Sequence, residues 1–205
     1  MASGLTSFIR KIRFGDPVII VSGLPRSGTS MCMKMLDAAE IPIVQDGIRE
    51  ADEDNPKGYY EYEKVKDLDK GGDNSWISEA RGKVVKIISF LLPHLPPENN
   101  YKIVFMGRNI DEILASQNKM LVRRGEPTDT TADEKMKKLY SDHLIKVRSM
   151  LRYRDEMDSI VIQYNDVLTD PRPQAEQMNG FLGGQYDVER MLSVVDKNLY
   201  RNRAS

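Results

Sequence analysis

The chain has 205 residues, of which 40% are hydrophobic and 30% are charged, enough apolar material for the core of one domain. Thirty Lys and Arg residues against 31 Asp and Glu give a net charge of −1, which gives no support to a protein that coats nucleic acid. A single cysteine, Cys32, excludes a disulfide framework and a cysteine-rich zinc site, and it fits a reducing compartment. No stretch approaches the roughly 20 apolar residues that span a bilayer. We therefore expect a cytoplasmic protein with no membrane span, no nucleic-acid partner and no metal.

Four short apolar segments predict strands, and none of them alternates cleanly between apolar and polar residues. This pattern is typical of strands buried on both faces, as in a parallel sheet between two layers of helices. A shorter fifth candidate lies at 41–44. The four main segments are residues 17–22, 83–89, 101–106 and 159–164.

Helical patterns lie between these strands. Apolar residues recur at helical spacing after Gly28, and Asn109 has the character of an N-cap for the next helix. A long helix is predicted over 132–157, and a last one starts at Asp170 and stops at Gly183. Alternating strands and helices predict a three-layer α/β fold with a doubly wound parallel sheet.

The whole of 1–205 is expected to form one domain, with 1–15 as an N-terminal extension. Two polar segments that contain Gly or Pro, 45–60 and 123–131, break the rhythm of strands and helices. Because loops at the carboxyl ends of strands build the sites of α/β folds, we expect these segments to line or cover the site.

The clearest signal is the segment VIIVSGLPRSGTS at 18–30, in which an apolar strand runs into a glycine-containing turn and then a helix. Gly23 and Gly28 allow backbone N–H groups to turn inward, and the helix start adds the positive end of a dipole. Arg26 and the two hydroxyls that follow Gly28 supply further donors. A tight glycine turn is the plainer interpretation, but the coincidence of these features favours a phosphate-binding loop.

The sequence PRSGTS after a buried strand resembles the 5′-phosphosulfate-binding loop of the sulfotransferases, which use 3′-phosphoadenosine 5′-phosphosulfate (PAPS). The form with Arg is similar to bacterial and carbohydrate-type members. The spacing also matches a Walker A loop, except that Thr29 stands where that loop has its Lys. The resemblance implies a PAPS donor, a PAP product, and six nucleotide-binding residues: Pro25, Arg26, Ser27, Gly28, Thr29 and Ser30.

A second stretch, IVFMGRNIDEILAS at 103–116, resembles the family's other signature, a strand that ends in Arg with a Ser eight residues later. In the family these two groups hold the 3′-phosphate, which implies the same role for Arg108 and Ser116. Taken alone, each residue is better explained as a surface side chain. As a spaced pair after a strand, in a chain that already has the loop, they favour the functional interpretation.

Two further stretches extend the resemblance, NPKGYYEYE at 55–63 and IVIQYNDVLTDP at 160–171. In the second, Asn165 departs from the usual Glu of the family. Tyr164, at the end of the predicted strand, is implied near the adenine or the mouth of the site, and core packing is its alternative role.

Sulfuryl transfer depends on positioning and on neutralising charge, by analogy with phosphoryl transfer. Arg26 serves this purpose, and the resemblance adds Lys86 as a second cation, for which a solvent-facing strand-edge lysine is the alternative. The family's histidine base has no counterpart after Lys86. Carbohydrate-type members use a Glu, which matches Glu61; Glu63 is the neighbouring candidate and Glu50 a weaker one. A dipole-stabilised acid at a helix start is the alternative role of Glu61.

The sequence therefore predicts a sulfotransferase that moves a sulfuryl group from PAPS to a hydroxyl or amine. Its acceptor is a small molecule, a carbohydrate or a lipid. A P-loop nucleotide kinase or NTPase is the rival enzyme class, although the loop lacks the Lys that such enzymes need. A nucleotide-binding relative without turnover is a third possibility. His94, His143, Trp76 and Cys32 are expected to be structural, and the basic residues Lys197, Arg201 and Arg203 to lie in a solvated tail.

Overall fold

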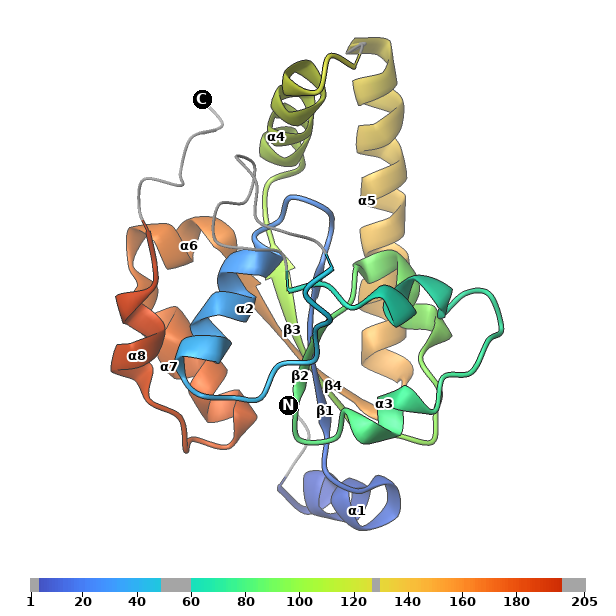
Figure 1. The fold of residues 1–205 in the computed structure, drawn as a ribbon, viewed down its shortest axis with the longest axis vertical. Coiled ribbons are helices and arrows are strands. Elements are labelled where there is room, and N and C mark those ends of the chain that lie inside the picture. Colours follow the sequence, from blue (N-terminus) through green and yellow to red (C-terminus); the bar gives the residue numbers. More distant parts are fainter. Residues whose placement is uncertain (1–3, 49–59, 127–129, 197–205) are drawn as a thin grey trace.

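The computed structural model describes residues 4–48, 60–126 and 130–196. Four strands form one sheet in the order β2–β1–β3–β4, and every neighbouring pair is parallel (Figure 1). They are β1 (Val18–Gly23), β2 (Val84–Lys86), β3 (Tyr101–Gly107) and β4 (Met157–Gln163).

Helices cover both faces of this sheet, so the predicted three-layer α/β fold is confirmed (Figure 1). Side chains alternate along β1: Ile19 and Val21 belong to one core, and Val18 and Ile20 to the other. The first core is closed by α2 (Thr29–Ala38), α6 (Tyr164–Thr169), α7 (Pro171–Leu182) and α8 (Val188–Ser193). The second is closed by η1 (Glu63–Asp67), α3 (Trp76–Glu79), η2 (Ser89–His94) and α5 (Thr130–Tyr153).

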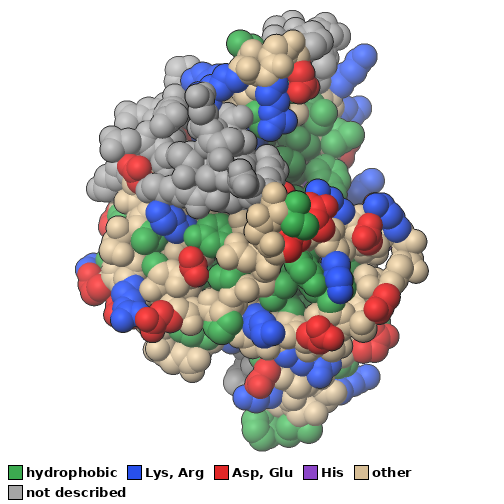
Figure 2. All heavy atoms as spheres, viewed as in Figure 1, with side chains coloured by type: hydrophobic (Ala, Val, Ile, Leu, Met, Phe, Trp, Pro, Cys, Tyr) green, Lys and Arg blue, Asp and Glu red, His purple; other side chains and the backbone are tan. Residues whose placement is uncertain are grey.

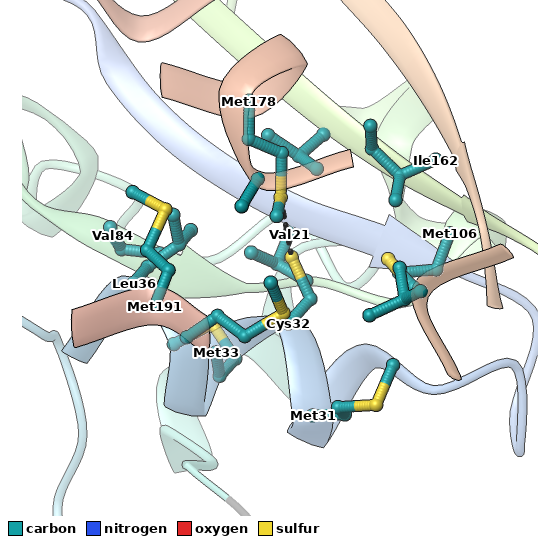
Figure 3. Close-up of a cluster of buried hydrophobic side chains, with 14 of the residues drawn as sticks. Val21, Met31, Cys32, Met33, Leu36, Val84, Met106, Ile162, Met178 and Met191 are labelled. Atoms are coloured by element: carbon teal, nitrogen blue, oxygen red, sulfur yellow. Dashed lines mark hydrogen bonds between the residues drawn. The ribbon is translucent and has the colours of Figure 1, made fainter. Parts of the chain in front are cut away.

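The first core is rich in sulfur, and Figure 3 shows methionines from three helices and a strand around Cys32. The Cys32 thiol lies 3.8 Å from the sulfur of Met178 and is fully buried. Unbranched thioethers fill irregular space between α2, α7 and α8, which suits a layer of several short helices. Cys32 is therefore a core residue, as expected, and this burial raises the pKa of its thiol to about 12.

The strand predictions need three corrections. Residues 87–89 leave the sheet after Lys86, because Ser89 begins the 3-10 helix η2. The fifth candidate, 41–44, makes only a single bridge, from Ile43 to Val84. The expectation that all strands are buried on both faces is wrong for β4, the last strand of the sheet, where Val161 is 44% exposed.

The helix predictions need three further corrections. The long helix α5 ends at Tyr153 rather than at 157, and Met157 already belongs to β4. Tyr164 begins the short helix α6 rather than ending a strand. The N-terminal extension contains a helix, α1 (Gly4–Phe14), whose Arg10 is buried against Asp158.

Different helices lie at the two ends of the sheet. At the carboxyl end of β3, α4 (Ile110–Arg123) and the first half of α5 stand beyond the strands (Figure 1). At the opposite end lies α1, where Figure 2 shows apolar side chains; Phe8, Ile9 and Ile12 are exposed there. Elsewhere on this face, acidic and basic side chains are interspersed (Figure 2). None of the helices in the described ranges has the length and apolar character that a bilayer span requires.

Candidate functional site

The order in which the chain connects the strands reverses beside β1, although all four strands are parallel. The chain passes from β1 to β2 on one side and then returns to β3 on the other. In open α/β sheets, ligands bind outside the carboxyl ends of strands at such a switch point. The loop 24–28 follows β1 at this point, and Arg108 follows β3.

The loop after β1 is shaped by two glycines. Gly28 has φ 98°, and a β-carbon built on it would lie 2.3 Å from the ring of Tyr164. At Gly23, φ is 151°, and a β-carbon would lie 2.7 Å from the backbone oxygen of Met106. Arg26 also adopts a left-handed conformation, with φ 66°, which is uncommon for a residue with a side chain and marks a constrained loop.

The polar groups of this loop suit an anion. The N-cap of α2 is Gly28, which offers no side-chain acceptor to the first amides of the helix. Ser27 is 1% exposed, and its hydroxyl has no hydrogen-bond partner among the described residues. Because a helix start also carries the positive end of the dipole, these donors form a cradle for a phosphate or sulfate group.

The structure brings the two sequence motifs together. The Nε of Arg26 donates to the Ser116 hydroxyl at 3.1 Å, across 90 residues of sequence. The Nη1 of Arg108 donates to the backbone oxygen of Arg26 at 3.0 Å. The guanidinium of Arg108 also lies over the Tyr164 ring, 4.3 Å from its centroid. Two guanidinium groups, two serine hydroxyls and a helix start therefore meet at one edge of the sheet.

Sequence reasoning missed a buried acid in this cluster. Glu112 accepts a hydrogen bond from the Nε of Arg108 at 3.1 Å and another from Asn165 at 3.1 Å, and its side chain is only 2% exposed. The spacing of Arg108 and Glu112, four residues apart across the start of α4, was the available signal. Asn165, where the sequence departs from the usual Glu of the family, is the side chain that reaches Glu112.

The proposed catalytic pair also meets. Lys86, at the end of β2, places its Nζ 3.3 Å from the Glu61 carboxylate, and the two side chains are 9% and 23% exposed. Lys86 is thus buried and paired rather than facing solvent. Glu63 is not brought to Lys86, since its carboxylate pairs with Lys66 at 2.6 Å and is 41% exposed. Glu50 lies outside the described residues.

The segment 45–60 is joined at its two ends. The Asp46 carboxylate accepts from the backbone N–H groups of Glu63 and Ile48, and these bonds lower the pKa of Asp46. The hydroxyl of Tyr60 donates to Asp37 on α2, and burial, with the nearby Asp37 charge, raises the pKa of Tyr60 to about 12. Residues 49–59, among them Gly58 and Tyr59, lie outside the described residues, as do 127–129 of the other predicted site loop and the basic residues of 197–205.

His143 is held in the structure rather than directed at the cluster of arginines. Its Nε2 lies 2.9 Å from the Ser89 hydroxyl, and its ring stacks on Phe90 at 3.8 Å. Burial lowers the pKa of His143, and the positive charge of Lys146 lowers it further. In the part of the chain that the structure describes, no three His, Cys, Asp or Glu side chains form a metal-binding group.

The parallel sheet, the glycine-bounded loop and the arginine cluster at its switch point define a P-loop-like α/β nucleotide-binding fold. The sulfotransferase domain family matches residues 16–203, so the chain belongs to the sulfotransferase family of PAPS-dependent transferases.

Solved structures of bacterial sulfotransferase domains share this fold. The domain from the Synechococcus PCC 7002 olefin synthase is 14% identical with a TM-score of 0.54, over 92% of this chain and 81% of that one. The domain from the curacin biosynthetic pathway is 15% identical with a TM-score of 0.53, over 88% of this chain and 78% of that one. No curated protein sequence matches the chain significantly.

Proposed function

We propose that this protein transfers a sulfuryl group from PAPS to a hydroxyl or amine of a small-molecule, carbohydrate or lipid acceptor. The observation that carries the proposal is the hydrogen-bonded chain Ser116–Arg26–Arg108, which joins the loop after β1 to the end of β3. A nucleotide with phosphates at both its 5′ and 3′ positions needs two neighbouring anion sites. The loop after β1 with the start of α2 supplies one, and Arg108 with Ser116 supplies the other.

The loop provides the site for the 5′-phosphosulfate. Its donors are the uncapped amides of α2 and the side chains of Arg26, Ser27, Thr29 and Ser30, while Pro25 and Gly28 set the path of the backbone. Arg108 and Ser116 are assigned to the 3′-phosphate. Tyr164 supports both parts, because its ring packs against Gly28 on one side and under the Arg108 guanidinium on the other.

When bound, PAPS would supply the sulfuryl group, which passes to the acceptor as its bond to the 5′-phosphate oxygen breaks, and PAP would be the leaving group. Arg26 and Lys86 then neutralise the negative charge that develops on the leaving oxygen. Glu61 holds Lys86 in place before the donor arrives and accepts the proton of the acceptor hydroxyl or amine. A carboxylate beside the second cation is positioned for both tasks.

The discriminating experiment is the ratio of affinities for PAP (3′-phosphoadenosine 5′-phosphate) and AMP, which differ only in the 3′-phosphate. By titration calorimetry, the wild type should prefer PAP strongly. Arg108→Ala should weaken PAP binding by about 1.5–3 kcal/mol and leave AMP binding nearly unchanged.

The matched control is Arg172→Ala, which removes an exposed arginine on α7 paired with Glu189 and should leave both affinities unchanged. A wild type that binds ATP with Mg²⁺ more tightly than PAP would favour the kinase class instead. Equal PAP and AMP affinities in the wild type would contradict the proposed donor.

A further inference from the structure

A buried carboxylate lies directly behind the proposed 3′-phosphate site. We propose that Glu112 is a positioning residue that holds Arg108 in its binding orientation and, through its charge, limits how tightly the site retains PAP. This inference rests on the proposed function, because it concerns the affinity of the same site for the leaving nucleotide. It assigns a role to the buried acid that contacts Arg108.

Positioning follows from the contacts of Arg108. Its Nε donates to Glu112 at 3.1 Å, its Nη1 donates to the Arg26 carbonyl at 3.0 Å, and its plane rests on the Tyr164 ring. A guanidinium held by a carboxylate, a carbonyl oxygen and an aromatic face has a set orientation before a ligand binds. Less side-chain entropy is then lost when a phosphate binds to it.

The charge of Glu112 acts on binding in the opposite direction. An arginine side chain that is 6% exposed needs a counter-charge when no ligand is present, and the 2% exposed Glu112 supplies it. A phosphate on the same guanidinium meets this carboxylate a few ångströms away, in surroundings that screen charge poorly. Glu112 therefore stabilises the empty site and weakens the filled one, which favours departure of the product.

Asn165 makes this idea testable without a change of shape. Its Nδ2 donates to Glu112 at 3.1 Å, while its Oδ1 is buried and has no partner among the described residues. In Glu112→Gln, the new amide nitrogen can donate to that Oδ1 after the Asn165 amide rotates by half a turn, and the remaining side-chain oxygen still accepts from Arg108. The variant removes the charge and keeps the hydrogen bonds to Arg108 and Asn165.

The experiment measures PAP and AMP affinity, the rate of PAP dissociation and the melting temperature of Glu112→Gln. We expect PAP binding about tenfold tighter than in the wild type, with slower dissociation by a similar factor and little change for AMP. The empty variant should melt at a lower temperature, and saturating PAP should raise its melting temperature by more than it does in the wild type. The rate of PAP dissociation remains measurable even if the empty variant is too unstable to purify without PAP.

Glu156→Gln is the matched control. Glu156 is also a buried carboxylate paired with an arginine, Arg154, but it precedes β4 at the opposite end of the sheet. The substitution Glu156→Gln should lower the melting temperature without changing PAP affinity. A conservative second variant, Glu112→Asp, keeps the charge but shortens the reach to Arg108, so it should bind PAP more weakly than the wild type.

Unchanged PAP affinity in Glu112→Gln would overturn the inference, and so would a loss as large as that of Arg108→Ala. A wild type with no preference for PAP over AMP would instead contradict the proposed function itself. The two failures are therefore distinguishable in one set of titrations.

Discussion

A buried ion pair can reveal the role of two residues that are separated in the sequence. Lys86 and Glu61 illustrate this: each alone is an ordinary polar residue, and together they form a largely buried ion pair beside the switch point. Burial raises the cost of leaving either charge uncompensated, so each side chain holds the other in place.

The substitution Glu61→Gln tests this role. It keeps the shape of the side chain but removes its capacity to take a proton, so kcat should fall about 10²–10⁴-fold while PAP affinity stays nearly constant. The measurement is turnover with labelled PAPS once a screen of hydroxylated metabolites, sugars and lipids has supplied an acceptor. Glu63→Gln is the control, since Glu63 pairs with Lys66 at the surface and should turn over normally. Full activity in both variants would mean that another group takes the proton.

At the scale of elements, the described ends of the segment 45–60 are tied together by one carboxylate. Asp46 accepts from the backbone N–H of Glu63 at 2.6 Å and of Ile48 at 3.0 Å. Its folded-state pKa is lowered by these two bonds. The stabilisation is therefore complete above the ordinary pKa of Asp and is lost as the pH falls through the lowered value.

Asp46→Ala should lower the free energy of unfolding at pH 7, and its difference from the wild type should narrow below about pH 4. Urea unfolding at several pH values measures this. Asp46→Asn keeps one acceptor oxygen but has no titrating group. Its free energy of unfolding at pH 7 should therefore lie between those of the wild type and Asp46→Ala, and it should fall less than that of the wild type as the pH is lowered. If the difference in free energy of unfolding between the wild type and Asp46→Ala became larger toward low pH, the stabilising role of the Asp46 carboxylate would be contradicted.

Local pattern and long-range contact explain what the sequence could predict. Strands β1, β2 and β3 were predictable because a strand covered on both faces must be apolar throughout. The start of α6 was not predictable, because Tyr164 directly follows an apolar segment rich in β-branched residues. In the structure, Tyr164 begins α6 and its ring packs on Gly28. In the candidate site, Arg108 and Ser116 were predicted because one chain segment resembles the family's second signature. The Glu112–Asn165 bond was not, because it joins side chains 53 residues apart.

At the scale of the whole molecule, the thiol of Cys32 reports on stability. It is fully buried between α2 and α7, and burial raises its pKa to about 12, so few native molecules present a reactive thiolate. Labelling requires the layer of helices to leave the sheet. A ligand that binds only the folded chain should slow that opening.

A chromogenic thiol reagent at pH 8 should label Cys32 slowly in the native protein and rapidly in urea. PAP at 100 times its dissociation constant should slow native labelling by about 100-fold when opening is rapid and reversible. Arg108→Ala should need more PAP for the same protection. Fast labelling of the native protein that PAP does not alter would show that the thiol is reached by local motion instead.

The contact between Gly28 and Tyr164 also restricts how this sequence can diverge over evolutionary time. Any residue larger than glycine at position 28 meets two obstacles at once, a left-handed φ of 98° and an aromatic ring 2.3 Å from where its β-carbon would lie. A smaller side chain at 164 removes only the second obstacle and also takes away the surface under Arg108. Single substitutions at these positions are therefore deleterious in either order, and descendants of this chain should retain the pair while the exposed faces of α4 and α5 vary.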